Sequence, residues 1–329
     1  MKNLIPVFLL LIGTPVFAQK TVKVKTVLAA EEEAGNYVKR EGLNKGLLKA
    51  MDGESIVFEP KPVNAREFYA TKSEDKGKLT WKPIFARVSR NGDMGFTTGP
   101  YEYTDADGEK KNGEYVSVWK EDAGKKLRLF TTLRIAHSPV DQALIQDYRD
   151  PANGPVKFES TDPFSGKSMI LANDKTFNST LSLNVPAAFK EFYSAQGRLL
   201  FPTYAPITGE ANLNFFLRNN KIAIKAEPIG AGRAASNDLA YSYGRATVVY
   251  NKNPQNFYYL RVWEIDEKHR WNIVTEIYTP ETGEFKLNNS DDNAQLSDGD
   301  SAAVDTVAIP KDNVKVKKAK RRKKSDDSE

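Results

Sequence analysis

The spacing of hydrophobic positions changes once within the first half of the chain. From Thr26 to Arg40 apolar residues recur at helical spacing, and residues 79–135 then alternate between apolar and polar in four short runs. The turn-forming pairs Asn91-Gly92 and Ala123-Gly124 lie between these runs. The pattern predicts helices followed by four antiparallel strands, an α+β layer with the helices on one face of a curved sheet.

Two shorter helices are expected over residues 44–51 and 64–69, the second with Asn64 as its N-cap. The same order of patterns returns in the second half, where the first helix is expected within 167–183 and the strands within 220–277. Residues 137–166 are predicted to be a linker between the halves.

An internal repeat relates the two halves. Asp238 follows Asp93 by 145 residues, and Trp263 follows Trp119 by 144, with similar residues around both pairs. A unit of this length far exceeds a solenoid period, so it predicts two domains, over residues 25–136 and 167–280.

The last strand of the first half is expected to have two unlike faces. Alternation places Phe130, Thr132 and Arg134 on one face and Leu127, Leu129 and Leu133 on the other. The apolar face must be buried, and the pattern leaves open whether the mixed face borders a pocket or a domain interface.

The strand motifs carry a family resemblance. The run TWKPIFARVSRNGDMGFTTGPYEY at 80–103, followed by GEYVSVWKED at 113–122, resembles the SnoaL-like branch of the nuclear transport factor 2-like superfamily, in particular secreted bacterial domains of unknown function. The second copy keeps Asp238, Tyr241 and the tryptophan strand but loses one glycine. The resemblance spans nearly all of residues 26–280 and implies two tandem cones packed sheet to sheet. This fold hosts isomerases, cyclases, dehydratases, transport factors and non-catalytic binders, so it predicts fold more narrowly than function.

Catalytic members of the superfamily place an acid or base in the mouth of the cone. The resemblance aligns that position with Thr132 in the first copy and Glu276 in the second, so Glu276 is the catalytic candidate, with Tyr278 or Arg134 as a helper. The alternative for Glu276 is an exposed strand carboxylate. The candidates for lining a pocket are Trp81, Phe96, Tyr115, Trp119, Thr132, Arg134, Tyr241, Tyr259, Trp263, Glu276 and Tyr278, although aromatic residues at such positions equally suit a core.

The composition limits the available chemistry. The chain has no cysteine and two histidines, which excludes disulfides and thiolate zinc sites. No HExxH, phosphate-loop or GxGxxG motif occurs, so no metal and no cofactor is predicted. His137 is expected in the linker and His269 in an exposed hairpin, and Asp93 and Asp238 are interpreted as tight-turn residues.

Both ends of the chain differ from the middle. Residues 1–18 read as a signal peptide cleaved after Ala18, which predicts a periplasmic or secreted protein without a transmembrane segment after cleavage. Residues 283–329 have the composition of a disordered tail, acidic first and then basic. Nine Lys or Arg and one Asp give residues 311–324 a local charge of +8, so the rest of the chain carries −3 of the net +5. The candidates for binding a polyanion are Lys315, Lys317, Lys318, Lys320, Arg321, Arg322, Lys323 and Lys324.

Three functions remain open from the sequence. The first is a non-catalytic protein that binds a small apolar ligand or acts as a scaffold. The second is an isomerase, cyclase or dehydratase that uses Glu276 as acid or base. The third is an envelope protein whose basic tail binds an anionic surface or polyanion, without specific nucleic-acid recognition.

Overall fold

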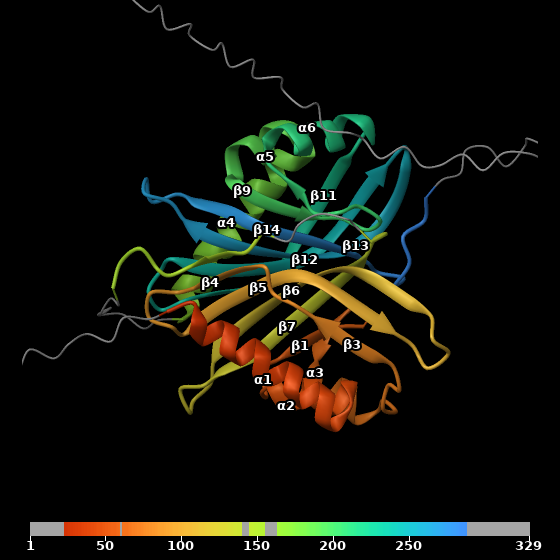
Figure 1. Ribbon diagram of the computed structural model, residues 1–329. Helices are drawn as coiled ribbons and strands as arrows, with labels where there is room; N and C mark the ends of the chain where they lie inside the picture. The colour runs from red at the N-terminus through yellow and green to blue at the C-terminus, as the bar shows by residue number, and fades with distance from the viewer. Residues whose placement is uncertain (1–22, 60, 140–144, 155–162, 288–329) are drawn as a thin grey trace, which may run out of the picture. The chain divides into compact units, whose positions relative to one another are not determined.

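The computed structural model describes residues 23–59, 61–139, 145–154 and 163–287, which lie in one compact unit (Figure 1). Its first half contains α1 (Lys25–Glu41), α2 (Leu43–Ala50), β1 (Ile56–Phe58), β2 (Pro62–Asn64), α3 (Ala65–Ala70), β3 (Lys78–Trp81), β4 (Phe85–Val88), β5 (Met94–Thr104), β6 (Lys110–Glu121), β7 (Leu127–Ala136) and β8 (Asp147–Arg149). Its second half contains α4 (Pro163–Leu183), α5 (Val185–Phe192), β9 (Tyr193–Leu200), β10 (Ile207–Thr208), α6 (Glu210–Asn219), β11 (Ala223–Arg233), β12 (Leu239–Tyr250), β13 (Asn253–Ile265) and β14 (Trp271–Pro280). The predicted α+β class is confirmed.

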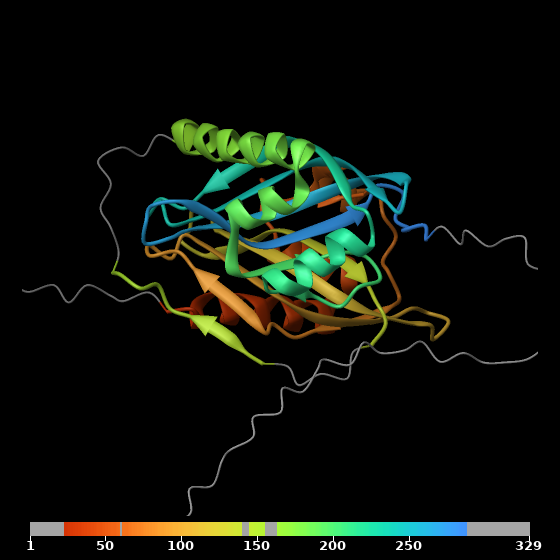
Figure 2. The same ribbon diagram turned by 90° about the horizontal axis from the view of Figure 1, so that it is seen from above.

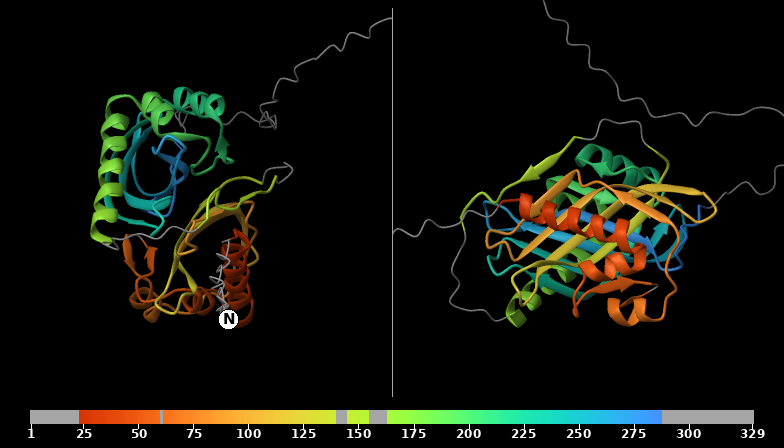
Figure 3. Two further views of the ribbon diagram at one scale, coloured as in Figure 1. Left: turned by 90° about the vertical axis from the view of Figure 1, so that its left-hand side faces the viewer. Right: turned by 60° about the horizontal axis from the view of Figure 1, so that its bottom comes forward.

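Each half packs its helices on one large sheet. The first sheet has the order β7-β6-β5-β4-β8 with β3 also paired to β5, and the second has the order β10-β9-β14-β13-β12-β11. Helix α1 crosses the strands of the first sheet (Figure 3), and α4 lies along the second sheet against β11 and β12 (Figure 2). Asn64 caps α3 as expected, because its side chain accepts from the backbone N–H groups of Arg66 and Glu67. We call each helix-covered sheet a cone.

The sheets are mixed, which corrects the antiparallel sheets expected from the sequence. β8 runs parallel to β4, and β9 runs parallel to β14. β8 comes from the expected linker, so part of that segment belongs to the first sheet. Short parallel pairs like these carry little alternation of their own, which is why the pattern did not predict them.

A β-bulge occurs at the same place in both halves. Val118 and Trp119 of β6 pair with Thr131 and Leu129, so Phe130 is the extra residue on β7. Val262 and Trp263 of β13 pair with Thr275 and Ile273, so Val274 is the extra residue on β14. Both tryptophans are fully buried, on equivalent strands of the two cones. A bulge adds one residue to a strand and so reverses the alternation of faces beyond it.

The bulge corrects the expected faces of β7. Leu129 packs in the helix-covered core of the first cone, on the side where Thr132 and Arg134 also lie. Phe130 and Leu133 instead pack on the opposite face of the sheet. The face predicted to be uniformly apolar is thus divided between two cores.

Those opposite faces of the two sheets form one shared core. Its buried members from the first half are Phe85, Met94, Phe96, Val116, Val118, Phe130, Leu133 and Ile135, and those from the second are Leu200, Ala234, Leu239, Tyr241, Leu260, Val262, Val274 and Ile277. The ring centroids of Phe130 and Tyr241 lie 4.7 Å apart. The two cones therefore pack sheet to sheet.

Two hairpins lock this packing by reciprocal hydrogen bonds. The backbone N–H of Arg90 donates to Asp238 Oδ2 over 2.9 Å, and that of Ala235 donates to Asp93 Oδ2 over 2.6 Å. Ala235 stands in the second copy where Arg90 stands in the first, so the contact is self-complementary, as in an isologous dimer. Asp93 and Asp238 lie in tight turns as interpreted, and they also join the halves.

The described chain continues past the expected start of the tail at residue 283. Phe285 packs edge-on against Phe201 and Tyr250, with ring centroids 5.3 and 5.1 Å apart. Residues 283–287 therefore contribute to the second cone, and the boundary predicted from composition is too early. One aromatic residue among polar neighbours was the signal for this.

We predict that the Asp238→Ala variant lowers the free energy of unfolding by about 1–3 kcal/mol, because it removes a charge-assisted bond across the halves and the ion pair with Arg90. Chemical unfolding of the full chain measures this loss. Asp105→Ala is the control, since among the described residues the Asp105 side chain accepts only from the N–H groups of Asp107 and Glu109 in its own turn. An equal loss in both variants would contradict a role in joining the halves.

Candidate functional site

The interior of the first cone contains a buried carboxyl group from α1. Val27, Glu31, Ala34 and Val38 form the buried stripe of this helix, at spacings of four, three and four residues. Glu31 occupies an apolar position of the stripe and is only 3% exposed, so its side chain faces the sheet. The stripe itself was the signal for this residue, which the sequence analysis did not select.

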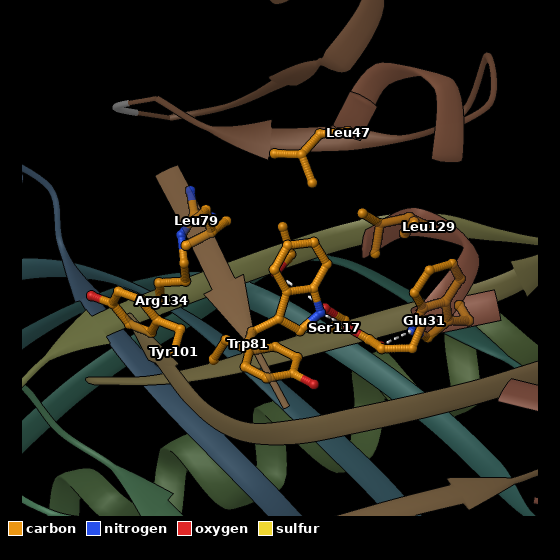
Figure 4. A pocket seen from close by; sticks show the side chains of 12 residues that line it. Glu31, Leu47, Leu79, Trp81, Tyr101, Ser117, Leu129 and Arg134 are labelled. Carbon is orange, nitrogen blue, oxygen red and sulfur yellow. Dashed lines mark hydrogen bonds between the residues drawn. The ribbon is translucent and has the colours of Figure 1, made fainter. Parts of the chain in front are cut away.

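Glu31 accepts hydrogen bonds from three side chains of the sheet. Trp81 Nε1 donates to Oε1 over 2.5 Å, and Trp119 Nε1 donates to Oε2 over 3.0 Å (Figure 4). Thr97 Oγ1 also donates to Oε2. Burial raises the pKa of Glu31 above its ordinary value, although these donors act in the opposite direction. No cation pairs with Glu31 among the described residues, so these neutral donors are its partners in this interior.

A narrow cavity adjoins Glu31. Its lining includes Trp81, Tyr115, Trp119, Thr132 and Arg134, all of them predicted pocket residues. The cavity measures about 10 Å³, which is the room needed by about one water molecule. Side chains therefore fill almost all of the first cone.

The interior of the second cone is held by a buried arginine. Arg261 Nε donates to Glu276 Oε1 over 2.5 Å, and Arg261 Nη1 donates to Asp174 Oδ1. All three side chains are fully buried. Burial disfavours the charge of Arg261, but the carboxylates of Glu276 and Asp174 hold its pKa well above the ordinary value. The cluster therefore combines one cation with two acids.

Tyrosines complete this cluster. Tyr193 donates to Glu276 Oε2, and Tyr259 donates to Asp174 Oδ2 over 3.0 Å. Arg261 Nη2 also donates to the hydroxyl of Tyr278 over 3.2 Å. The guanidinium carbon lies 3.9 Å from the centre of the Tyr259 ring. Each oxygen of Glu276 thus has a partner from the same chain.

Equivalent positions of the two cones differ in charge. Ser117 pairs across the strands with Thr132 in the first cone, where the hydroxyl oxygens lie 3.1 Å apart. Arg261 and Glu276 occupy the same cross-strand positions in the second cone. A neutral hydroxyl pair in one copy therefore corresponds to an ion pair in the other.

The predicted site residues separate into three groups. Trp81, Tyr115, Trp119, Thr132 and Arg134 border the first-cone cavity, and Tyr259, Trp263, Glu276 and Tyr278 lie inside the second cone. Phe96 and Tyr241, predicted to line a pocket, instead pack between the two sheets. Glu276 is fully buried rather than an exposed strand carboxylate. The sequence analysis did not select Glu31, Asp174 or Arg261.

The remaining predictions concern metal sites, membrane-spanning helices and the two ends of the chain. Within the described ranges, no group of three or more His, Asp or Glu side chains is placed to hold a metal ion. No helix in the same ranges is long and apolar enough to cross a membrane. The signal-peptide residues 1–18 and the polyanion candidates from Lys315 to Lys324 lie outside the described residues.

Comparisons with known proteins give structural matches about one cone in length. A ketosteroid isomerase-like protein from Erwinia carotovora atroseptica SCRI1043 matches with 14% identity and a TM-score of 0.31 over 34% of this chain and 94% of its own. An NTF2-like protein from Cytophaga hutchinsonii matches with 17% identity and a TM-score of 0.30 over 34% of this chain and 96% of its own. Each of these likenesses covers about a third of this chain, and the packing of helices on one sheet in each half agrees with the predicted α+β fold class. No family model and no curated protein matches the sequence.

We predict that Glu31→Gln changes how stability depends on pH. Because the folded-state pKa of Glu31 is raised, its contribution to stability is complete below the ordinary value of 4.5 and is lost as pH rises through the folded-state value. The variant should therefore gain stability relative to the wild type as pH rises above the ordinary value of 4.5, as measured by chemical unfolding. Glu32→Gln, which alters an exposed carboxyl on the same helix, is the matched control. A shift of the same size in both variants would refute a special role for Glu31.

Proposed function

We propose that the protein is a non-catalytic binding or scaffolding protein, in which the cones act as a rigid frame rather than as reaction chambers. The observation that carries this proposal is the engagement of Glu276. Its carboxylate, the acid or base candidate of the second cone, is bonded by Arg261 on one oxygen and by Tyr193 on the other. A general base needs a lone pair within reach of the substrate proton, and here the nearest groups are internal donors.

The first cone supports the same proposal. Its cavity holds about one water molecule, whereas pockets for small organic ligands usually measure about 300–1,000 Å³. Glu31 is occupied by two indole N–H groups and a hydroxyl. In both cone interiors the buried carboxyl groups are therefore hydrogen-bonded to other side chains of the same chain.

We predict losses of stability of different size for two variants of the second cone. Arg261→Met leaves Asp174 and Glu276 buried without a cation and should cost about 3–5 kcal/mol of unfolding free energy. Glu276→Gln leaves Arg261 balanced by Asp174 and should cost about 1–3 kcal/mol. Chemical unfolding of both variants measures the difference.

The same proteins test catalysis with a β,γ-unsaturated ketosteroid as probe, since its conversion to the conjugated isomer is followed by ultraviolet absorption. We expect the wild type to react at the rate of buffer. Turnover by the wild type that is lost in a folded Glu276→Gln variant would overturn the proposal in favour of the isomerase alternative.

We further propose that the protein works in the periplasm or outside the cell and that its tail binds anionic surfaces. The signal-peptide pattern of residues 1–18 supports the proposed localisation. The charge of +8 over residues 311–324 supports binding of anionic surfaces by the tail. A basic residue near an anionic lipid surface contributes about 1 kcal/mol of attraction.

We predict that the chain is retained on heparin and that a chain ending at Asn288 is not. Retention should weaken as salt rises, because each neutralised anionic group releases counterions. A chain in which residues 315–324 keep their length but carry Gln in place of Lys and Arg is the control for charge. Retention of the truncated chain on heparin, or retention that does not change with salt concentration, would contradict a role for the tail.

A further inference from the structure

A cavity of about 450 Å³ lies outside both cones, where the ends of β6 and β7 face β9 and β10. Its lining from the first half includes Asn112, Glu114 and His137, and its lining from the second half includes Arg198, Pro206 and Thr208. The volume falls in the range of small-molecule sites. Within the described part of the chain it is far larger than the cavity inside the first cone.

Three polar atoms around this cavity are enclosed without a hydrogen-bond partner among the described residues. They are Glu114 Oε2, His137 Nε2 and Arg198 Nε. Glu114 is 4% exposed, so its carboxyl group has largely lost contact with solvent. Buried polar atoms are rarely left unpaired, because each such atom costs the free energy of desolvation without a compensating bond. Their convergence on one cavity indicates that a ligand supplies the missing partners.

The backbone holds these groups apart. Glu114 lies within β6, between Pro100 of β5 and Ile135 of β7. Arg198 lies within β9, between Thr208 of β10 and Thr275 of β14. The two side chains attract each other but form no ion pair, and the Arg198 guanidinium instead lies 5.4 Å from the centre of the Phe85 ring.

His137 presents an acceptor to the same space. Its Nδ1 lies 2.7 Å from the carbonyl oxygen of Ser138, which requires a proton on Nδ1. Burial lowers the pKa of His137, so the ring is neutral and its Nε2 is a free acceptor. The cavity therefore offers a cationic donor, a carboxyl group and a neutral acceptor between apolar walls.

The second half provides an internal comparison. A cavity of about 400 Å³ lies at the corresponding end of β14, with Glu281 at the position equivalent to His137. There Arg245 donates to Glu281 over 2.7 Å, and Tyr258, the equivalent of Glu114, donates to it over 3.4 Å. Glu281, Arg245 and Tyr258 thus satisfy one another, so the unpaired set around Glu114 is not a general consequence of the fold.

We propose that the cavity between β6, β7, β9 and β10 binds a small hydroxylated carboxylic acid with an apolar body. The ligand carboxylate accepts from Arg198, whose guanidinium suits planar anions, and the ligand hydroxyl donates to His137 Nε2. Glu114 meets the polar edge of the ligand between them. This site rests on the proposed binding function and names its ligand class.

The binding of such an acid depends on pH through Glu114. Burial raises the pKa of Glu114 to about 7, although the charge of Arg198 acts in the opposite direction. The titratable or charged groups around it are Arg198 on β9, His137 after β7, Tyr101 on β5 and the adjacent Tyr115. Protonation of Glu114 below this pKa removes its repulsion of the ligand carboxylate, so affinity should rise as pH falls through neutrality.

Titration calorimetry of the full chain with 4-hydroxyphenylacetate as probe tests the proposal. We expect one probe bound per chain, weaker binding of phenylacetate, which lacks the hydroxyl, and no binding of tyramine, which carries a cation. Arg198→Met should weaken binding by about tenfold or more. Arg198→Lys, which keeps the charge but not the planar donor set, provides a second variant if the first does not fold.

Two further variants complete the test. Glu114→Gln should bind the probe at neutral pH as tightly as the wild type does at lower pH, and its affinity should respond less to pH. Arg245→Met, a substitution in the satisfied copy, should leave binding unchanged.

The absence of binding by both acids, or equal binding by the Arg198 variants, would overturn this site. Neither result affects the structural role of the cones, which the ketosteroid experiment tests separately.

Discussion

The structure depends on the burial of two apolar sheet faces against each other. Each cone covers one face of its sheet with helices and leaves the other face apolar, and the shared core draws buried residues from both halves. Exposure of such a face to water would cost about 25 cal/mol for each Å² of apolar surface. The reciprocal bonds of Asp93 and Asp238 give this non-directional attraction a fixed orientation.

The shared core packs the two halves together outside the cone interiors. The polar side chains inside the two cones differ. The first interior keeps a lone carboxyl group among indoles and hydroxyls, and the second holds Arg261 between two acids. These are two ways of accommodating polar groups in a low-dielectric space, one by surrounding a carboxyl group with neutral hydrogen-bond donors and the other by pairing charges. The same backbone, including the bulge on the strand beside each tryptophan, supports both.

Much of the fold followed from the sequence because the signals were local or repeated. The helical stripe of α1, the cap at Asn64 and the equivalence of Trp119 with Trp263 were all visible in the residues. The bulge was not visible, since one added residue leaves no mark on composition, and it reversed the faces assigned to Phe130 and Leu129. The parallel pairing of β8 was missed because three residues are too few to show a period.

The candidate sites were harder to predict because their members are distant in sequence. Arg261 meets Asp174 across 87 residues and Glu276 across 15, and no spacing rule connects them. Glu276 was selected through the family resemblance, whereas its partners were not. The unpaired set of Glu114, His137 and Arg198 has no motif at all, because it arises only where the two halves meet.

The joining of both halves in one chain has a consequence in mass action. Two separate subunits pay the entropy of association at every encounter, so their pairing weakens on dilution. Here the partner sheet is tethered, and its effective concentration is set by the chain rather than by the number of molecules in solution. The paired sheets and the cavity between the halves thus persist in a single molecule at any dilution.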